Sequence, residues 1–145
     1  MAQQETASTP QRARPLICII EDDAPLQQLL HEVLLAEGYQ TVGWDRGDGA
    51  FEFLRMVQPD LVLLDLWLEH PDAGRMVLGL LTVDPATQHI PIIVCSAHQQ
   101  LLRAQASHVP AQGYVLLEKP YAMEDLLAHI RAVLGGSDAR QVGAA

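Results

Sequence analysis

Short apolar runs recur along the chain and are separated by segments of helical periodicity. Five runs have the length of β-strands: 16–20, 40–44, 61–64, 90–95 and 114–117. Three of them are apolar at successive positions, which is typical of strands buried on both faces. The sequence therefore predicts a sheet whose strands lie mostly inside the molecule.

Apolar residues at helical spacing fill the gaps between these runs. The clearest set recurs at i, i+3, i+4, i+7 and i+8: Leu26, Leu29, Leu30, Val33 and Leu34. Pro25 suits the first turn of this helix and Gly38 its end. Similar faces predict helices over 50–57, 77–81 and 123–134, and a weaker pattern predicts another over 99–106.

Strands and helices thus alternate along the chain. This order predicts an α/β fold with a parallel sheet, right-handed crossovers and helices on both faces. Residues 15–134 would form one domain between a disordered N-terminal tail, 1–14, and a flexible C-terminal tail, 135–145, both of which lack periodicity. In such sheets ligands bind at the carboxyl ends of the strands, so candidate chemistry is expected there.

Composition predicts a folded, soluble domain. The chain has 145 residues, of which 49% are hydrophobic and 19% charged, so it can fill a core. Its formal charge of −9, without a basic stripe, argues against binding to nucleic acid. No apolar run approaches the roughly 18–20 residues of a membrane span, and the polar start lacks a secretion signal. We therefore expect a cytoplasmic protein in which Cys18 and Cys95 are core residues rather than a disulfide.

Polar residues gather where the predicted strands end. Glu21 and Asp22 follow the first strand, Asp65 the third, Ser96 the fourth and Lys119 the fifth. Burying a carboxylate such as Asp65 is costly without a partner, and neighbouring acidic groups raise that cost. A cluster of this kind suits a cation, and Mg²⁺ is commonly held by one or two carboxylates together with a phosphate.

The same residues have the properties that phosphoryl transfer requires. Lys119 would neutralise a phosphoryl oxygen, and the Ser96 hydroxyl would donate a hydrogen bond to the phosphoryl group. Positioning and charge stabilisation account for most of the catalysis of this transfer. Asp65 as the acceptor would give a covalent acyl phosphate.

Together these residues resemble a known family. They lie in a fixed order at the predicted strand ends: Glu21-Asp22, Asp65, Ser96 and Lys119-Pro120. On them, residues 15–134 resemble the receiver domain of bacterial two-component response regulators. The resemblance implies a flavodoxin-like, doubly wound (βα)5 sandwich whose five-stranded parallel sheet has the order 2-1-3-4-5. It also implies that Asp65 is the phosphoacceptor, and that a histidine kinase or a histidine phosphotransfer protein donates the phosphoryl group.

A metal site also follows from the resemblance. Asp22 and Asp65 would bind Mg²⁺, or Mn²⁺ in its place, through their carboxylates. Glu21 would act through water, and the main-chain carbonyl of Trp67 would be the third protein ligand.

Roles around the phosphoryl group are likewise implied by the resemblance. Ser96 and Lys119 would hold the phosphoryl oxygens, and the Lys119–Pro120 peptide bond would be cis. Trp67 and His98 would flank the phosphoryl group and modulate its lifetime. The bulky indole of Trp67 would do so by impeding attack by water.

Two departures from the family pattern bear on signalling. The family often has Tyr or Phe where this chain has Leu116, and Tyr114 should point to the same side of the strand. Either Tyr114 replaces that aromatic residue or the family's aromatic-rotation step is absent, and we favour absence. The loop 66–73 before Gly74 is one residue longer than is usual in the family and contains Pro71.

The resemblance implies a stand-alone signalling module and not an enzyme. Phosphorylation would switch binding of another protein in trans through the face formed by 99–106, 114–117 and 123–134, with homodimerisation left open. The alternatives are a phosphorylation-independent adaptor and a small flavodoxin-like enzyme. Aspartate-nucleophile phosphatases commonly have a second Asp where this chain has Trp67, which disfavours the enzyme.

Asp23 is better explained as the cap of the first helix.

Overall fold

A parallel five-stranded sheet forms the centre of the molecule. The computed structural model describes residues 13–106 and 114–135. The strands are β1 (Leu16–Ile20), β2 (Gln40–Trp44), β3 (Leu61–Asp65), β4 (Ile92–Ser96) and β5 (Val115–Glu118). Their order in the sheet, β2-β1-β3-β4-β5, confirms the predicted flavodoxin-like arrangement. The two predicted tails fall almost wholly outside the described residues.

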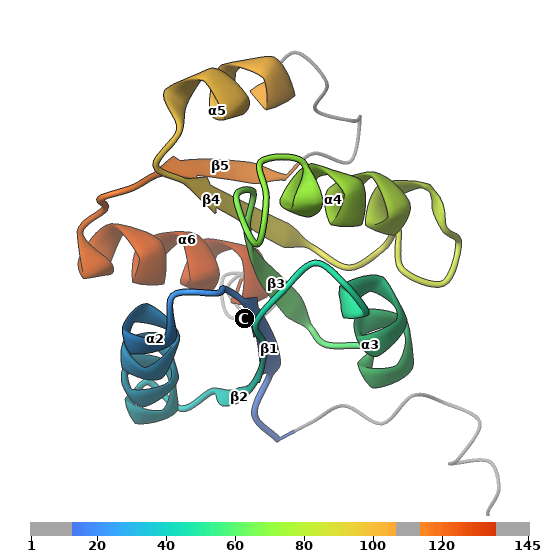
Figure 1. Cartoon of the computed structure of the whole chain (residues 1–145). Helices are drawn as coiled ribbons and strands as arrows, with labels where there is room; N and C mark the ends of the chain where they lie inside the picture. The colour runs from blue at the N-terminus through green and yellow to red at the C-terminus, as the bar shows by residue number, and fades with distance from the viewer. Residues whose placement is uncertain (1–12, 107–113, 136–145) are drawn as a thin grey trace, which may run out of the picture.

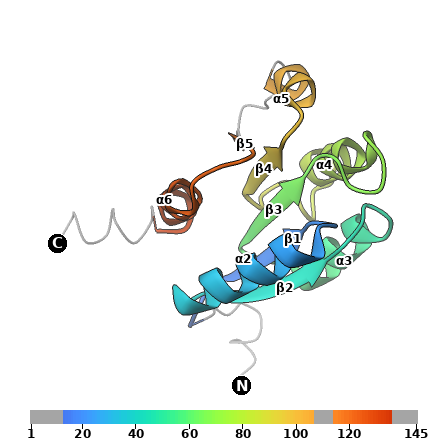
Figure 2. The same ribbon diagram turned by 60° about the vertical axis from the view of Figure 1, so that its left-hand side comes forward.

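Helices cover both faces of this sheet (Figures 1 and 2). They are α2 (Ala24–Ala36), α3 (Ala50–Val57), α4 (Ala73–Val83), α5 (Gln99–Ala106) and α6 (Met123–Leu134). The helices α2 and α6 pack on one face, whereas α3, α4 and α5 pack on the other. Within the described residues, no helix combines the length and the apolar character that crossing a bilayer requires.

Alternate side chains of the strands pack into two separate cores. On β1, Ile17 and Ile19 join the core beneath α2 and α6, whereas Cys18 and Ile20 join the core beneath α3 and α4. Every residue of the central strand β3 is buried, which explains its successive apolar residues. The last residue of that strand, Asp65, is therefore buried as well.

Local chemistry sets the ends of α2. Asp23 caps its N-terminus as predicted, since the Oδ1 of Asp23 accepts a hydrogen bond from the Leu26 amide at 3.1 Å. Gly38 follows the helix with a φ of 96°, a left-handed conformation that glycine adopts without a steric cost. The predicted limits of this helix are confirmed.

Two predicted boundaries need correction. The strand β4 begins two residues later than its apolar run, because the Ile90 amide bonds to the Thr87 carbonyl in a turn and Pro91 has no amide hydrogen to donate. The helix α4 begins at Ala73, four residues before the apolar pattern starts at Val77. Its first turn contains glycine and arginine, so hydrophobic spacing gave no sign of it.

Side-chain burial follows the predicted pattern with two exceptions. Cys18 and Cys95 are both buried free thiols, which confirms their assignment to the core. Leu29 and Leu80 belong to the predicted apolar faces but remain 46% and 47% exposed. They lie at the margins of their helices' apolar faces, where the sheet below does not reach them.

Candidate functional site

The polar residues predicted at the strand ends come together at one edge of the sheet. Asp65 lies opposite Cys95 in the register of β3 and β4, and Ser96 lies opposite Glu118 in that of β4 and β5. The pairing continues beyond the strands, because Lys119 donates its amide to the Ser96 carbonyl at 2.9 Å. The parallel ladder thus delivers the acceptor, the hydroxyl and the lysine to neighbouring positions.

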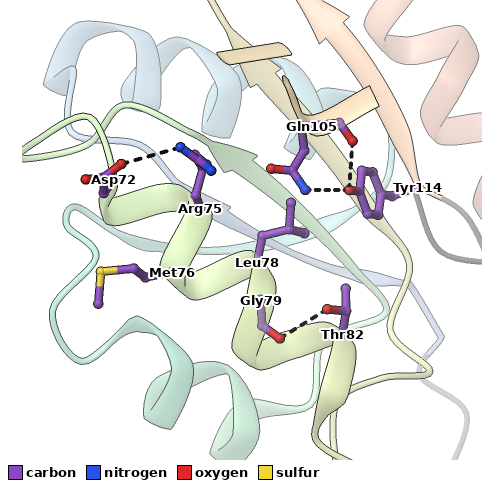
Figure 3. Close-up of a pocket in the computed structure, with 8 residues that line it drawn as sticks. All are labelled: Asp72, Arg75, Met76, Leu78, Gly79, Thr82, Gln105 and Tyr114. Atoms are coloured by element: carbon purple, nitrogen blue, oxygen red, sulfur yellow. Dashed lines mark hydrogen bonds and ion pairs between the residues drawn. The ribbon is translucent and has the colours of Figure 1, made fainter. Parts of the chain in front are cut away.

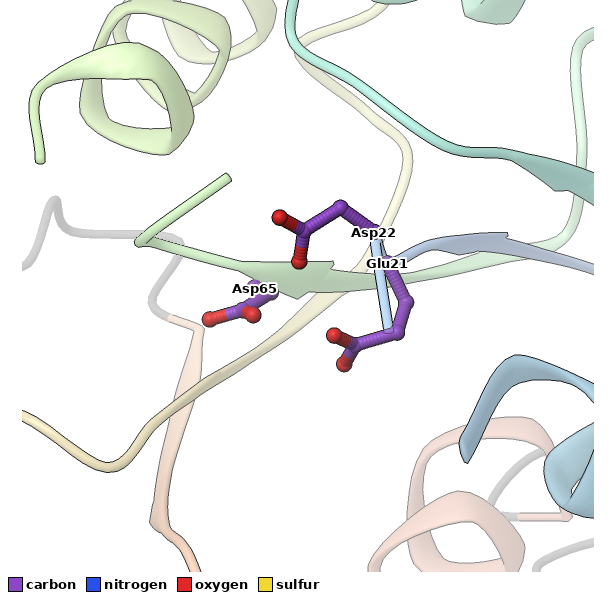
Figure 4. A group of neighbouring side chains, drawn as sticks. All are labelled: Glu21, Asp22 and Asp65. Carbon is purple, nitrogen blue, oxygen red and sulfur yellow. The ribbon is translucent and has the colours of Figure 1, made fainter. Parts of the chain in front are cut away.

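Three carboxylates form an acidic cluster at this edge. Glu21, Asp22 and Asp65 each offer a carboxylate oxygen, and these oxygens lie within 4.8 Å of one another (Figure 4). Glu21 and Asp65 are buried, with exposed fractions of 4% and 7%, whereas Asp22 is exposed. Solvent therefore reaches the cluster mainly at Asp22, whereas the other two carboxylates are buried.

Lys119 is the only lysine in the sequence, and its ammonium group lies inside this cluster. Its Nζ is 2.8 Å from Oε1 of Glu21 and 3.3 Å from Oδ2 of Asp65. Burial would lower the pKa of Lys119, but the hydrogen bond to Glu21 and the charge of Asp65 raise it. The ammonium group is therefore held in its charged form.

One lysine does not balance three carboxylates. Burial raises the pKa of Glu21 and of Asp65, although Lys119 acts in the opposite direction on both. The pKa of Asp22 is raised by desolvation and by the neighbouring charge of Glu21. All three shifts mean that the charged forms of these carboxylates are costly in the absence of a further positive charge.

The two oxygens of the Asp65 carboxylate have different partners. Its Oδ1 accepts a hydrogen bond from the Trp67 amide at 3.1 Å, and its Oδ2 faces Lys119. Ser96 is fully buried, and its Oγ accepts a hydrogen bond from the His98 amide at 3.0 Å. The Lys119–Pro120 peptide bond beside them is cis.

The rings of Trp67 and His98 stack on each other. Their ring centroids are 3.8 Å apart, with 25° between the ring planes. Each follows a site residue by two positions, Asp65 on β3 and Ser96 on β4. The resemblance implies that both residues flank the phosphoryl group, but their contact with each other depends on the adjacency of β3 and β4.

Sequence reasoning missed two residues that connect separate segments at this edge of the sheet. The Gln27 side-chain amide donates to the carbonyls of Glu21 and Trp44, at 3.0 and 3.2 Å, and so holds the end of β1 against that of β2. The Glu69 carboxylate accepts hydrogen bonds from main-chain amides of the connection between β2 and α3. Neither residue lies in a motif, and only the tertiary fold brings them to their partners.

A hollow of about 560 Å³ lies apart from the acidic cluster (Figure 3). It lies between α4 and the residues Gln105 and Tyr114, and its lining shares no residue with the acidic cluster. Tyr114 accepts a hydrogen bond from the Gln105 side chain at 2.7 Å. Tyr114 and Leu116 pack against the same core, as the alternation along the strand predicted.

The chain is similar to known signalling proteins. The response regulator receiver domain family matches residues 17–131. The phosphate regulon transcriptional regulatory protein PhoB of Klebsiella pneumoniae is 31% identical over 119 residues, which are 81% of this chain and 51% of PhoB. The chain thus spans about half the length of the curated relatives it matches.

Solved structures share the architecture. The BeF3-activated N-terminal receiver domain of RstA from Klebsiella pneumoniae has a TM-score of 0.70 and 26% identity, with 82% of this chain and 97% of that chain covered. The Mn²⁺-bound form of response regulator Rcp1 has a TM-score of 0.64 and 25% identity, with 82% and 91% covered. In both cases the likeness extends over most of each chain.

Proposed function

Because the chain belongs to the response regulator receiver domain family, a family of signalling domains, we propose that Asp65 accepts a phosphoryl group from a phosphohistidine of a partner protein. The observation that carries the proposal is the position of Lys119 between Asp65 and Glu21, inside a cluster of three carboxylates. The donor would be a histidine kinase or a histidine phosphotransfer protein. The phosphorylated domain would then act on another protein in trans.

The donor set of the cluster fits a divalent cation. Three carboxylates and one ammonium group leave about two negative charges, which Mg²⁺ or Mn²⁺ would balance. Asp22 and Asp65 would bind the ion directly, Glu21 through water, and Trp67 through its carbonyl. When bound, the ion would neutralise negative charge on the phosphoryl oxygens. The related Rcp1 binds Mn²⁺, which agrees with this choice of ion.

The residues of the chain itself position the transfer. A carboxylate oxygen of Asp65 would form the new P–O bond while the P–N bond to the donor imidazole breaks, and the electron pair would stay on that nitrogen. The Lys119 ammonium group lies beside the acceptor and would stabilise charge on the phosphoryl oxygens. The Ser96 hydroxyl would donate a hydrogen bond to one of those oxygens.

The helix α5 is the element best suited to transmit the signal. It buries none of its side chains fully, so it would shift at a lower cost than the other helices. Hydrogen bonds join it to both ends of β5: Gln99 donates to Glu118 at 2.6 Å, and Gln105 donates to Tyr114 at 2.7 Å. The face formed by α5, β5 and α6 would be the surface that the downstream protein reads.

The stacked rings of Trp67 and His98 would set the lifetime of the phosphorylated state. Trp67 is 38% exposed, and its main-chain amide already bonds to Asp65, so its indole would lie near the acyl phosphate and would impede the approach of water. We expect Trp67→Asn to shorten the half-life of the phosphorylated protein after the donor is removed. An unchanged half-life would show that the indole does not shield the site.

Intact-mass spectrometry after incubation with acetyl phosphate and Mg²⁺ tests the acceptor. We expect an adduct of about 80 Da on the wild type and none on Asp65→Ala. Asp60→Ala, at the opposite end of β3, should be labelled like the wild type. An adduct of equal yield on Asp65→Ala would overturn the assignment, and no adduct on the wild type would favour a phosphorylation-independent adaptor.

A further inference from the structure

The Glu69 carboxylate joins two loops at the carboxyl edge of the sheet, the edge that holds the acidic cluster. Its Oε1 accepts a hydrogen bond from the Gly47 amide at 2.6 Å, and its Oε2 accepts one from the Asp48 amide at 3.1 Å. Glu69 belongs to the connection between β3 and α4, whereas Gly47 and Asp48 belong to that between β2 and α3. Both oxygens of one side chain are thus used to hold two separate segments together.

The segment that receives Glu69 is firmly fixed. The Trp44 indole donates a hydrogen bond to the Asp48 carbonyl at 2.8 Å and stacks on Phe53 with 4.7 Å between ring centroids. Gly49 has a φ of 79°, and a Cβ added to it would lie 2.8 Å from the Trp44 ring. The two amides that bind Glu69 therefore form a rigid anchor.

The segment that carries Glu69 is held more loosely. Its beginning is fixed, because the Gly74 amide donates to the Leu66 carbonyl at 2.9 Å and Leu68 is buried. Beyond Leu68 the residues up to Asp72 are exposed, and this loop is the one that the sequence predicts to be a residue longer than usual. Glu69 is the point at which this exposed stretch meets the anchor.

Trp67 lies two residues before this contact. Its amide bonds to the Asp65 carboxylate, its ring stacks on His98, and its carbonyl is the proposed third ligand of the metal. The main chain at Trp67 therefore lies between Asp65, which binds its amide, and buried Leu68, which the Glu69 contact follows directly.

We propose that Glu69 is a positioning residue for the metal site, which it serves by holding the main chain of Trp67 in place through the Gly47 and Asp48 amides. The inference rests on the proposed function, because it assigns the Trp67 carbonyl to the metal. Residues that orient metal ligands typically change metal affinity by about 10- to 100-fold when they are replaced. Glu69 touches neither the metal nor the phosphoryl group and acts through Trp67.

A Mg²⁺ titration of the full chain without phosphodonor tests this role. Protein labelled with fluorotryptophan gives one fluorine NMR signal for each tryptophan, and Trp67→Phe identifies the signal of Trp67. We expect Glu69→Ala to raise the Mg²⁺ dissociation constant about tenfold and to broaden the Trp67 signal. Glu69→Gln should fall between it and the wild type, because an amide oxygen can still accept one of the two hydrogen bonds.

Asp60→Asn is the matched control. Asp60 also accepts a main-chain hydrogen bond across the fold, from the Leu16 amide at 2.7 Å, but at the opposite end of the sheet. We expect this variant to lower the melting temperature and to leave the Mg²⁺ dissociation constant unchanged. Wild-type Mg²⁺ affinity in both Glu69 variants, or an equal loss in Asp60→Asn, would overturn the positioning role. Absence of Mg²⁺ binding and of the adduct in the wild type would instead overturn the proposed function itself.

Discussion

The two ends of the same sheet use buried or half-buried acidic groups in opposite ways. At the amino end, the Asp60 carboxylate accepts the Leu16 amide at 2.7 Å, and the Asp60 amide donates to the Leu16 carbonyl at 2.8 Å. At the carboxyl end, Glu21 and Asp65 share the single ammonium group of Lys119. Main-chain groups of the fold satisfy the Asp60 carboxylate, whereas the acidic cluster around Lys119 retains excess negative charge.

The difference is between a carboxylate that stabilises the fold by itself and carboxylates that stabilise it only when a cation is bound. A hydrogen bond between a carboxylate and the main chain stabilises the folded state whether or not anything binds. Buried carboxylates with raised pKa values do the reverse, since they gain stability only when another cation arrives. The carboxyl end of the sheet is thus the end at which charged acidic groups lower the stability of the metal-free protein, as the proposed function requires.

The largest expected effect is on the rate of phosphorylation, when the ammonium group at the carboxyl end is removed. Lys119→Ala should slow formation of the acetyl phosphate adduct about 100-fold, because it removes the cation beside the acceptor. The rate is measured by intact mass against time at saturating Mg²⁺. Lys119→Arg keeps the charge and should retain part of the rate; a wild-type rate in Lys119→Ala would mean that the lysine serves the fold alone.

Removing one carboxylate from each end should give opposite results. Asp22→Asn should raise the Mg²⁺ dissociation constant at least about tenfold while leaving the metal-free protein as stable as the wild type, because Asp22 is exposed and repelled by Glu21. Asp60→Asn should lower the free energy of unfolding by about 1 kcal/mol without changing Mg²⁺ affinity, because the amide oxygen accepts the Leu16 amide more weakly than the carboxylate does. Titration calorimetry and urea unfolding measure the two quantities. If both variants lost stability and metal affinity together, the proposed division between a stabilising Asp60 and a metal-binding Asp22 would be wrong.

The sequence predicts most of the sheet and of the acidic cluster because both are encoded in order along the chain. Asp65 ends a run of buried residues, and parallel strands bring their carboxyl ends together, so candidate neighbours could be named from the strand ends, and the family resemblance supplied the strand order. The partners of Gln27 and Glu69 could not be named, because they depend on how two loops approach each other in space. The stacking of the Trp67 ring on that of His98 has the same origin.

The pH dependence of stability should report the excess charge at the carboxyl end, with a smaller effect. Burial raises the pKa of Glu21 and Asp65, so above pH ~4 the folded state retains protons that the unfolded chain has released. The stability of the metal-free protein should therefore fall as pH rises through those raised pKa values. Mg²⁺ at about ten times its dissociation constant should restore about 1.4 kcal/mol at neutral pH.

Melting temperatures measured against pH, with and without Mg²⁺, show this trend. Asp65→Asn should flatten the metal-free curve, because it removes one of the groups with a raised pKa. A curve for Asp65→Asn that parallels the wild type would place the pH dependence outside the acidic cluster.

The smallest expected effect is at the amino end of β5, where Tyr114 contacts α5. Tyr114→Phe removes the hydrogen bond to Gln105 and should lower the free energy of unfolding by about 0.5–1.5 kcal/mol. A double-mutant cycle with Gln105→Ala isolates this contact from the packing of the ring. The rate of adduct formation should stay at the wild-type value, because the contact lies at the end of β5 away from Lys119. A slower rate would show that Tyr114 couples α5 to the acidic cluster, as an aromatic residue at the position of Leu116 would in the family.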